Sequence, residues 1–184
     1  MIKPQEFLER WNKDVYGLVH YKEDVIDNSS ILNNDKNFLL IAGLPESAAP
    51  FLSFEGSDQG GGKPLNEKYE VSENKFKEFI YIGFTGENNP ICISTKSGAI
   101  VSFDYQNNFD EIFINSSINQ LAESLLIYVD FVKKIKLVNG RKAFLEKNAP
   151  TDLILWLEEE LRKIDKNALT ENSFWKIEME SYEQ

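Results

Sequence analysis

The sequence predicts an α+β fold in which a central, largely antiparallel sheet is flanked by helices. Helical patterns of apolar residues lie toward both ends of the 184-residue chain, and strand-like segments are concentrated in its middle. Strands that follow one another, instead of alternating with helices, are typical of α+β proteins and not of parallel α/β folds. The short turns between these strands also indicate antiparallel pairing.

A meander is predicted between about residues 79 and 114. Its strands are rich in β-branched and aromatic residues and cover Phe79–Phe84, Ile91–Thr95, Ala99–Asp104 and Phe109–Ile114. The sequences TGENNP, KSG and YQNN between them are compact turns, which can join only antiparallel neighbours. Because apolar and polar residues alternate in the last two strands, we expect one covered face and one partly solvated face.

Two helices and a short strand are predicted before the meander. Pro4 suits the first turn of an N-terminal helix, because its missing N–H would have no helical partner there. A second helix is expected over about Ser30–Ala42, with Gly43 ending it in the left-handed conformation. Phe51–Glu55 follows as a short strand candidate.

Two further helices are predicted after the meander. Ser117 followed by Gln120 is a capping-box pattern, in which the serine hydroxyl accepts from the third residue and the glutamine reaches back. The helix that begins there carries an apolar stripe, which we expect to pack on the sheet. A last long helix is expected over about Thr151–Asp165. The tail at 174–184 alternates apolar and polar residues, which favours a strand, and a helix is the alternative.

Length and charge limit the classes of partner. With 42% hydrophobic residues, residues 1–184 are expected to form a single domain. The net charge of −10 disfavours binding to nucleic acid and to anionic membrane surfaces, which attract cationic proteins. No apolar segment approaches the ~20 residues of a membrane span. One cysteine and no apolar leader indicate the cytoplasm, and the sequence does not indicate the oligomeric state.

Residues that usually carry catalysis or bind metal are scarce. His20 is the sole histidine, and Cys92 lies between Ile91 and Ile93, where a small buried apolar role is expected. One His and one Cys cannot assemble a usual zinc site, and no serine has the G-x-S-x-G context of a nucleophile elbow. We therefore expect no catalytic residue, metal or cofactor. The abundant carboxylates leave a paired-carboxylate hydrolase as the enzymatic alternative.

A glycine-rich segment, GSDQGGGKP at Gly56–Pro64, is predicted to be a flexible surface loop. It is not a phosphate-binding loop, because that motif needs Gly where Ser57 stands and Ser or Thr where Pro64 stands. Binding residues are often carried by loops, so this segment is a candidate for recognising a partner.

Several short segments stand in a characteristic order along most of the chain. They are Gly43-Leu44-Pro45, Phe51–Phe54, Ile82-Gly83, Ser97-Gly98 with Ile100-Val101 and Phe103-Asp104, Asn115-Ser116-Ser117 with Leu121, Leu125 and Tyr128, and Asp165 with Ala168-Leu169 and Phe174-Trp175. This set resembles the SUKH superfamily of Smi1/Knr4-like proteins, and most closely its SUKH-4 group of bacterial immunity proteins. The motif-bearing region is about 5–133, and the C-terminal helix and tail at 150–184 also resemble that group.

The resemblance implies a SUKH fold and a role in immunity. Such a protein binds and neutralises the toxin domain of a polymorphic or contact-dependent bacterial toxin, and it needs no catalytic residue of its own. A regulatory or scaffolding module of the same superfamily is the alternative. The matched residues have structural explanations as caps, turns or close packing, so they say little about the partner.

Polar side chains in the glycine-rich loop and beside the turns of the meander are the candidate partner-binding residues. They are Glu55, Asp58, Gln59, Lys63, Glu87 and Asp104. If the toxin is a basic nuclease or deaminase, an acidic surface would mimic its nucleic-acid substrate. This hypothesis predicts that charge reversal at Glu55 and Asp58 abolishes protection, and that binding weakens with salt.

Overall fold

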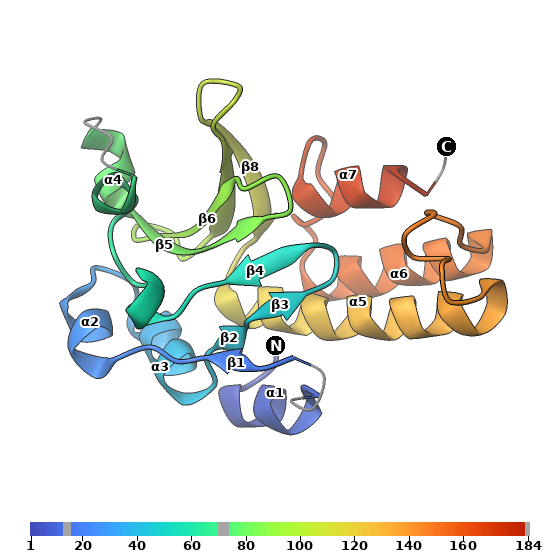
Figure 1. The fold of residues 1–184 in the computed structure, drawn as a ribbon, viewed down its shortest axis with the longest axis horizontal. Helices are drawn as coiled ribbons and strands as arrows, with labels where there is room; N and C mark the ends of the chain where they lie inside the picture. The colour runs from blue at the N-terminus through green and yellow to red at the C-terminus, as the bar shows by residue number, and fades with distance from the viewer. Residues whose placement is uncertain (13–15, 70–73, 183–184) are drawn as a thin grey trace.

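The computed structural model describes residues 1–12, 16–69 and 74–182, and it confirms the α+β class (Figure 1). Its main sheet is antiparallel throughout, with six strands in the order β3-β4-β5-β6-β7-β8. The strands are β3 Ser47–Ala48, β4 Leu52–Phe54, β5 Phe79–Thr85, β6 Pro90–Ser94, β7 Ile100–Asp104 and β8 Asp110–Asn115. The predicted meander is therefore confirmed and extended by two strands at one edge. A separate small sheet pairs β1 (Leu18–Val19) with β2 (Leu44–Pro45).

Helices surround this sheet. They are α1 Pro4–Arg10, α2 Glu23–Asn28, α3 Asn33–Ile41, α4 Leu65–Lys68, α5 Ile118–Asn139, α6 Thr151–Ile164 and α7 Phe174–Glu180, with short 3₁₀ helices at Ser57–Gln59 and Asn74–Glu78. In Figure 1, α5 and α6 lie side by side and α7 lies beside β8. Helices α1, α2 and α3, drawn in blue, lie together below the sheet, toward the lower left of the view. Of the helices in the described ranges, none has the length and apolar character needed to cross a membrane.

Both faces of the central strands are buried. One face carries Ile80, Ile93 and Ile114 into the main apolar core, which it shares with the predicted apolar stripe of α5. On the opposite face, Tyr81, Cys92, Val101 and Phe103 are covered by Leu65 of α4 and Phe76 of the second 3₁₀ helix. The expectation of a partly solvated face is wrong for β7, whose first four residues are buried, because a segment to which the sequence assigned no structure folds across it. It is partly confirmed for β8, where Asp110 and Glu111 are exposed.

The predicted ends of the N-terminal helices are partly confirmed. Helix α1 begins at Pro4, and Gly43 follows α3 with a φ of +66°, as a left-handed stop requires. Helix α3 begins at Asn33 and not at Ser30, since Ile31 enters the core from extended chain before it. The six-residue helix α2 was not predicted, because it is too short to show a clear apolar period.

The tail forms helix α7, so the strand alternative is wrong and the helix alternative is confirmed. Trp175 and Met179 are buried four residues apart, as one helical face requires, whereas Ile177 is 49% exposed. The alternation in the sequence is real, but its middle apolar residue faces away from the core.

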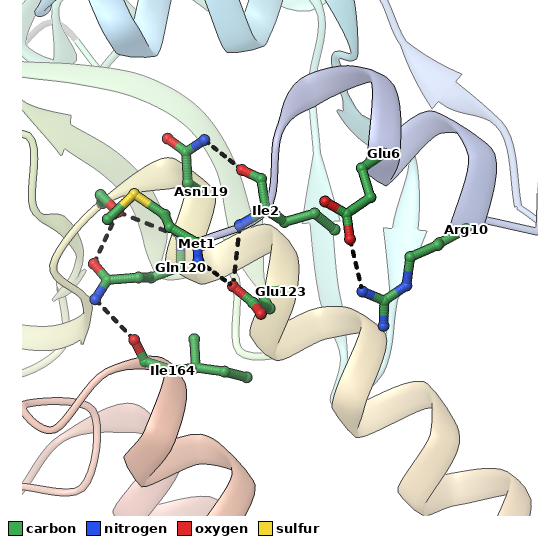
Figure 2. A network of polar contacts seen from close by, with 9 residues as sticks. Met1, Ile2, Glu6, Arg10, Asn119, Gln120, Glu123 and Ile164 are labelled. Carbon is green, nitrogen blue, oxygen red and sulfur yellow. Dashed lines mark hydrogen bonds and ion pairs between the residues drawn. The ribbon is translucent and has the colours of Figure 1, made fainter.

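Polar contacts hold the start of the chain and the end of α6 against α5 (Figure 2). The Ser117 hydroxyl accepts from the Gln120 N–H at 3.3 Å, which confirms the N-cap. The Gln120 side chain reaches to α6, where its Nε2 donates to the carbonyl of Ile164 at 3.0 Å. Asn119 donates to the carbonyl of Ile2 at 2.7 Å. Gln120 also reaches back as expected, but its Oε1 accepts from the Ser117 hydroxyl, at 2.8 Å, and not from the backbone N–H of a full capping box.

The glycine-rich segment packs closely on its neighbours. The Gly62 N–H donates to the Tyr81 carbonyl at 2.9 Å, and the Tyr81 N–H donates to the Lys63 carbonyl at 2.9 Å. A Cβ atom on Gly61 would lie 1.9 Å from the carbonyl oxygen of Glu55. The glycines therefore allow close backbone approach, and the interpretation of this segment as a flexible loop is corrected.

Replacing Gly61 with alanine is expected to lower the free energy of unfolding by about 3 kcal/mol, because the backbone must move to admit the methyl group. Gly17→Ala is the control. Gly17 has no left-handed φ, and its Cβ position meets only the flexible end of the Glu46 side chain, at 3.2 Å, so that variant should change stability by less than about 1 kcal/mol. Urea unfolding measures both values. Equal losses would show that space at Gly61 is not limiting.

Candidate functional site

The predicted partner-binding residues lie in three separate places. Glu55, Asp58, Gln59 and Lys63 lie together in the segment after β4, Glu87 lies in the β5–β6 turn, and Asp104 ends β7. The first group is largely neutralised, because Glu55 pairs with Lys68 at 2.8 Å and Asp58 pairs with Lys22 at 2.5 Å. These residues therefore form no single acidic surface.

Asp104 stabilises the β7–β8 turn. Its carboxylate accepts from the Gln106 N–H at 3.1 Å and from the Asn107 side chain at 2.6 Å. A role in the turn explains this residue without a partner. Its predicted role in partner binding stays a prediction.

A hollow of about 440 Å³ lies between α7 and two turns of the sheet. This α7 groove is lined by Pro50 and Phe51 of the β3–β4 turn, by Thr85, Gly86, Glu87 and Asn89 of the β5–β6 turn, by Ser102 and Ile112, and by Phe174, Ile177 and Glu178 of α7. In Figure 1 both turns lie on the side of the sheet that α7 occupies. Segments far apart in the sequence thus form one concave surface.

Phe51 presents an aromatic ring at the groove. Its side chain is 51% exposed, and its ring stacks on Phe144 with centroids 5.2 Å apart. Its φ is +58°, a left-handed conformation that costs a bulky residue about 1–2 kcal/mol. Gly86 makes room for it, since a Cβ there would lie 2.9 Å from the Phe51 Cβ. A strained backbone that exposes a large apolar side chain is typical of a binding position.

Polar groups lie among the apolar walls of the groove. Thr85 and Ser102 are buried, and Asn89 is 5% exposed. The Thr85 hydroxyl accepts from the Glu87 and Asn89 N–H groups, both at 3.3 Å, and so shapes the turn. Asn89 Oδ1 has no hydrogen-bond partner among the described residues. A buried acceptor without a donor costs about 1–3 kcal/mol, which a ligand that supplies the donor would recover.

The charges of the groove are acidic. Its described lining contains the carboxylates of Glu87 and Glu178 and no Lys, Arg or His. Glu178 is neutralised by an ion pair with Lys147 and also accepts from the Tyr128 hydroxyl. Glu87 takes part in no ion pair among the described residues. Its carboxylate is therefore the uncompensated charge of the groove.

A second hollow of about 270 Å³ lies between the end of α1 and α5. Its walls are mainly apolar and include Trp11 and Leu126. Its charged lining residues are Arg10, Lys133 and Lys136 against Asp130. The two grooves thus differ in sign of charge.

The described residues offer little for catalysis. Cys92 is fully buried, and burial raises the pKa of its thiol well above the ordinary value. Across the described ranges, no cluster of three or more His, Cys, Asp or Glu side chains could hold a metal ion. Burial raises the pKa of the Asp35 carboxyl to about 6, but Asp35 lines neither groove.

A buried polar network joins the end of β8 to the segment between α6 and α7. Asp165 accepts from the Ser116 N–H at 2.6 Å, from the Ser116 hydroxyl at 3.0 Å and from the Asn167 N–H at 3.1 Å. Asn115 donates to Asp165 at 3.4 Å and accepts from the Trp175 indole at 2.9 Å. Residues that carry the sequence resemblance therefore have a structural role in this network.

Most residues that line the α7 groove were not singled out in the sequence, among them Phe51, Asn89 and Ile177. Phe51 was included in a strand, Asn89 in a turn, and Ile177 in a buried alternating tail. No local pattern marks them, because their common surface exists only when the two turns and α7 are brought together. Glu87 is the one predicted partner-binding residue that lines this groove.

The comparisons with known proteins agree with the resemblance seen in the sequence. The family model of the SUKH-4 immunity protein matches residues 4–181. Neither the curated proteins nor the solved structures gave a match. Because the matched residues include every helix and strand from α1 to α7, the chain belongs to the SUKH-4 immunity protein family.

Proposed function

We propose that this chain is an immunity protein that neutralises a cognate bacterial toxin domain by binding it directly. The family match over residues 4–181 is the observation that carries the proposal. Inhibition by binding needs an ordered scaffold and a complementary surface, but no reactive group. The apolar core that extends from Ile2 to Tyr182 supports such a scaffold and a single domain over residues 1–184.

The α7 groove is the surface that we propose for contact with the toxin. Phe51 and Ile177 supply exposed apolar area, and Glu87 supplies a carboxylate beside it. Aromatic side chains in concave surfaces with a polar rim are typical of binding hot spots. Glu55 and Asp58 stay secondary candidates, because each already has a lysine partner.

A basic toxin domain, such as a nuclease or deaminase, is the class of partner that the net charge of −10 suits. Opposite charges steer association and suppress wrong partners. We also propose that the inhibitor acts in the cytoplasm, a reducing compartment in which the single thiol of Cys92 stays free.

Co-expression with the toxin domain encoded beside this gene tests the proposal. We expect growth to be restored and the two proteins to co-purify, with an unrelated toxin domain as the control. Raising the salt from about 0.1 M to about 1 M should weaken binding, because the Debye length falls from about 10 Å to about 3 Å. Absence of both protection and complex, together with capture of several endogenous proteins, would favour the scaffolding alternative.

A further inference from the structure

We propose that the α7 groove binds an arginine side chain of the partner, stacked on Phe51 and paired with Glu87. This inference rests on the proposed function, because it names the chemistry that the toxin presents. It combines three features of one hollow: an aromatic face, an uncompensated carboxylate and a buried acceptor without a donor.

The carboxylate of Glu87 sets the sign of the ligand's charge. No cationic side chain belongs to the described lining of the groove, and the other carboxylate, Glu178, is already paired with Lys147. A cation that enters next to apolar walls loses part of its hydration and needs a carboxylate partner. The second groove, with three cations and one carboxylate in its lining, has the opposite preference.

Asn89 provides the directional contact. Its Oδ1 can only accept a hydrogen bond, and it lacks a donor among the described residues. Oδ1 itself lies beneath the groove surface, so the amide must turn about its terminal torsion, which is broad in asparagine, to meet a donor inside the groove. An N–H donor from the partner would satisfy an atom that is otherwise buried at a cost.

Arginine fits these features better than lysine. A guanidinium is planar, carries five donors, is weakly hydrated and stacks on aromatic faces. It can therefore contact the part of the Phe51 ring that Phe144 and Lys147, whose Nζ lies 6.0 Å from the ring centroid, leave exposed, while it donates to Glu87 and Asn89. An ammonium group has no flat face and is more strongly hydrated. Ile177 and Ile112 would contact the aliphatic part of the side chain.

The first test uses N-acetyl-arginine amide as a probe and does not require the toxin. Titration into the ¹⁵N-labelled full chain should shift the Asn89 side-chain amide and the Gly86 and Glu87 backbone amides in a saturable way. N-acetyl-citrulline amide, which has the shape but not the charge, should bind at least about tenfold more weakly, as expected for loss of a charged hydrogen bond. N-acetyl-lysine amide should also bind more weakly than the arginine probe.

Charge reversal provides the matched variants. Glu87→Lys should abolish the shifts caused by the arginine probe and weaken toxin binding at least about tenfold. Asp27→Lys makes the same change in net charge on α2, which lies across the molecule from α7 in Figure 1, and should bind both ligands as the wild type does. Thermal unfolding of both variants checks that they fold.

The outcomes separate this inference from the proposed function. If the arginine probe leaves the Asn89 amide unshifted, or if Glu87→Lys binds the probe like the wild type, the inference is wrong. Protection by the wild type would then still support the immunity role. If the probe binds as expected but the wild type neither protects nor forms a complex, the proposed function fails and the arginine preference of the groove stands.

Discussion

Replacing Asp165 with alanine is expected to lower the free energy of unfolding by about 2–4 kcal/mol. Asp165 is 3% exposed and accepts hydrogen bonds from Asn115, Ser116 and Asn167. Without the carboxylate, the buried Asn115 amide and the part-buried Ser116 groups lose this acceptor, whereas the exposed Asn167 can turn to water. Each unsatisfied buried group costs about 1–3 kcal/mol. Most small domains have a total stability of about 5–15 kcal/mol, so this loss would be a large share.

Urea unfolding of Asp165→Ala measures this loss directly. Asp110→Ala, an exposed carboxylate at the start of β8, is the control and should change stability by less than about 0.5 kcal/mol. Fluorescence of the variant should also change, because Trp175 donates to Asn115 in the same network. A loss for Asp165→Ala as small as that of the control would show that the network adds little stability.

Asp35→Asn is expected to stabilise the protein at neutral pH by about 2 kcal/mol. Asp35 lies in the first turn of α3, is 3% exposed, and its Oδ2 has no hydrogen-bond partner among the described residues. Burial raises the pKa of the carboxyl from 3.8 to about 6. This rise corresponds to roughly 3 kcal/mol at a pH above both pKa values, of which the buried amide of asparagine would forfeit about 1 kcal/mol.

The stabilisation by Asp35→Asn should depend on pH, because the Asp35 carboxyl must be ionised to carry its burial penalty. Below pH 3.8 the carboxyl is protonated in both states and carries no penalty. As the pH rises from 3.8 through about 6, the unfolded state releases its proton first, so this residue lowers the stability of the wild type over that range. The stabilisation by Asp35→Asn should therefore be present at pH 8 and absent at pH 4 in urea unfolding. An equal effect at both values would contradict it.

Much of the secondary structure could be predicted from local patterns. The four strands of the meander each combine β-branched and aromatic residues with a short turn, and they form β5 to β8. Ser117 begins α5 because its hydroxyl satisfies a backbone N–H that has no helical partner. Gly43 ends α3 because it adopts a φ of +66° without a Cβ clash. These features depend on neighbouring residues alone.

Elements that depend on distant contacts could not be predicted in this way. Strands of two residues, such as β1 and β2, are too short for a period and form because they pair with each other. The helix at Asn74–Glu78 and α4 place Phe76 and Leu65 over the second face of the sheet, which the alternation of the strands did not reveal. The tail is helical because Trp175 and Met179 must share one buried face.

The α+β class, the meander, the first residues of α1, α5 and α6 and membership of the SUKH-4 immunity protein family were all recognisable from the order of residues. Local propensity, capping and apolar periodicity are properties of adjacent residues and can be read in order. The folded chain was needed to show that Glu55 and Asp58 are already paired with lysines, and that Glu87, Asn89 and Phe51 line a common hollow. Ion pairs and grooves form between segments whose distance in space the local sequence does not encode.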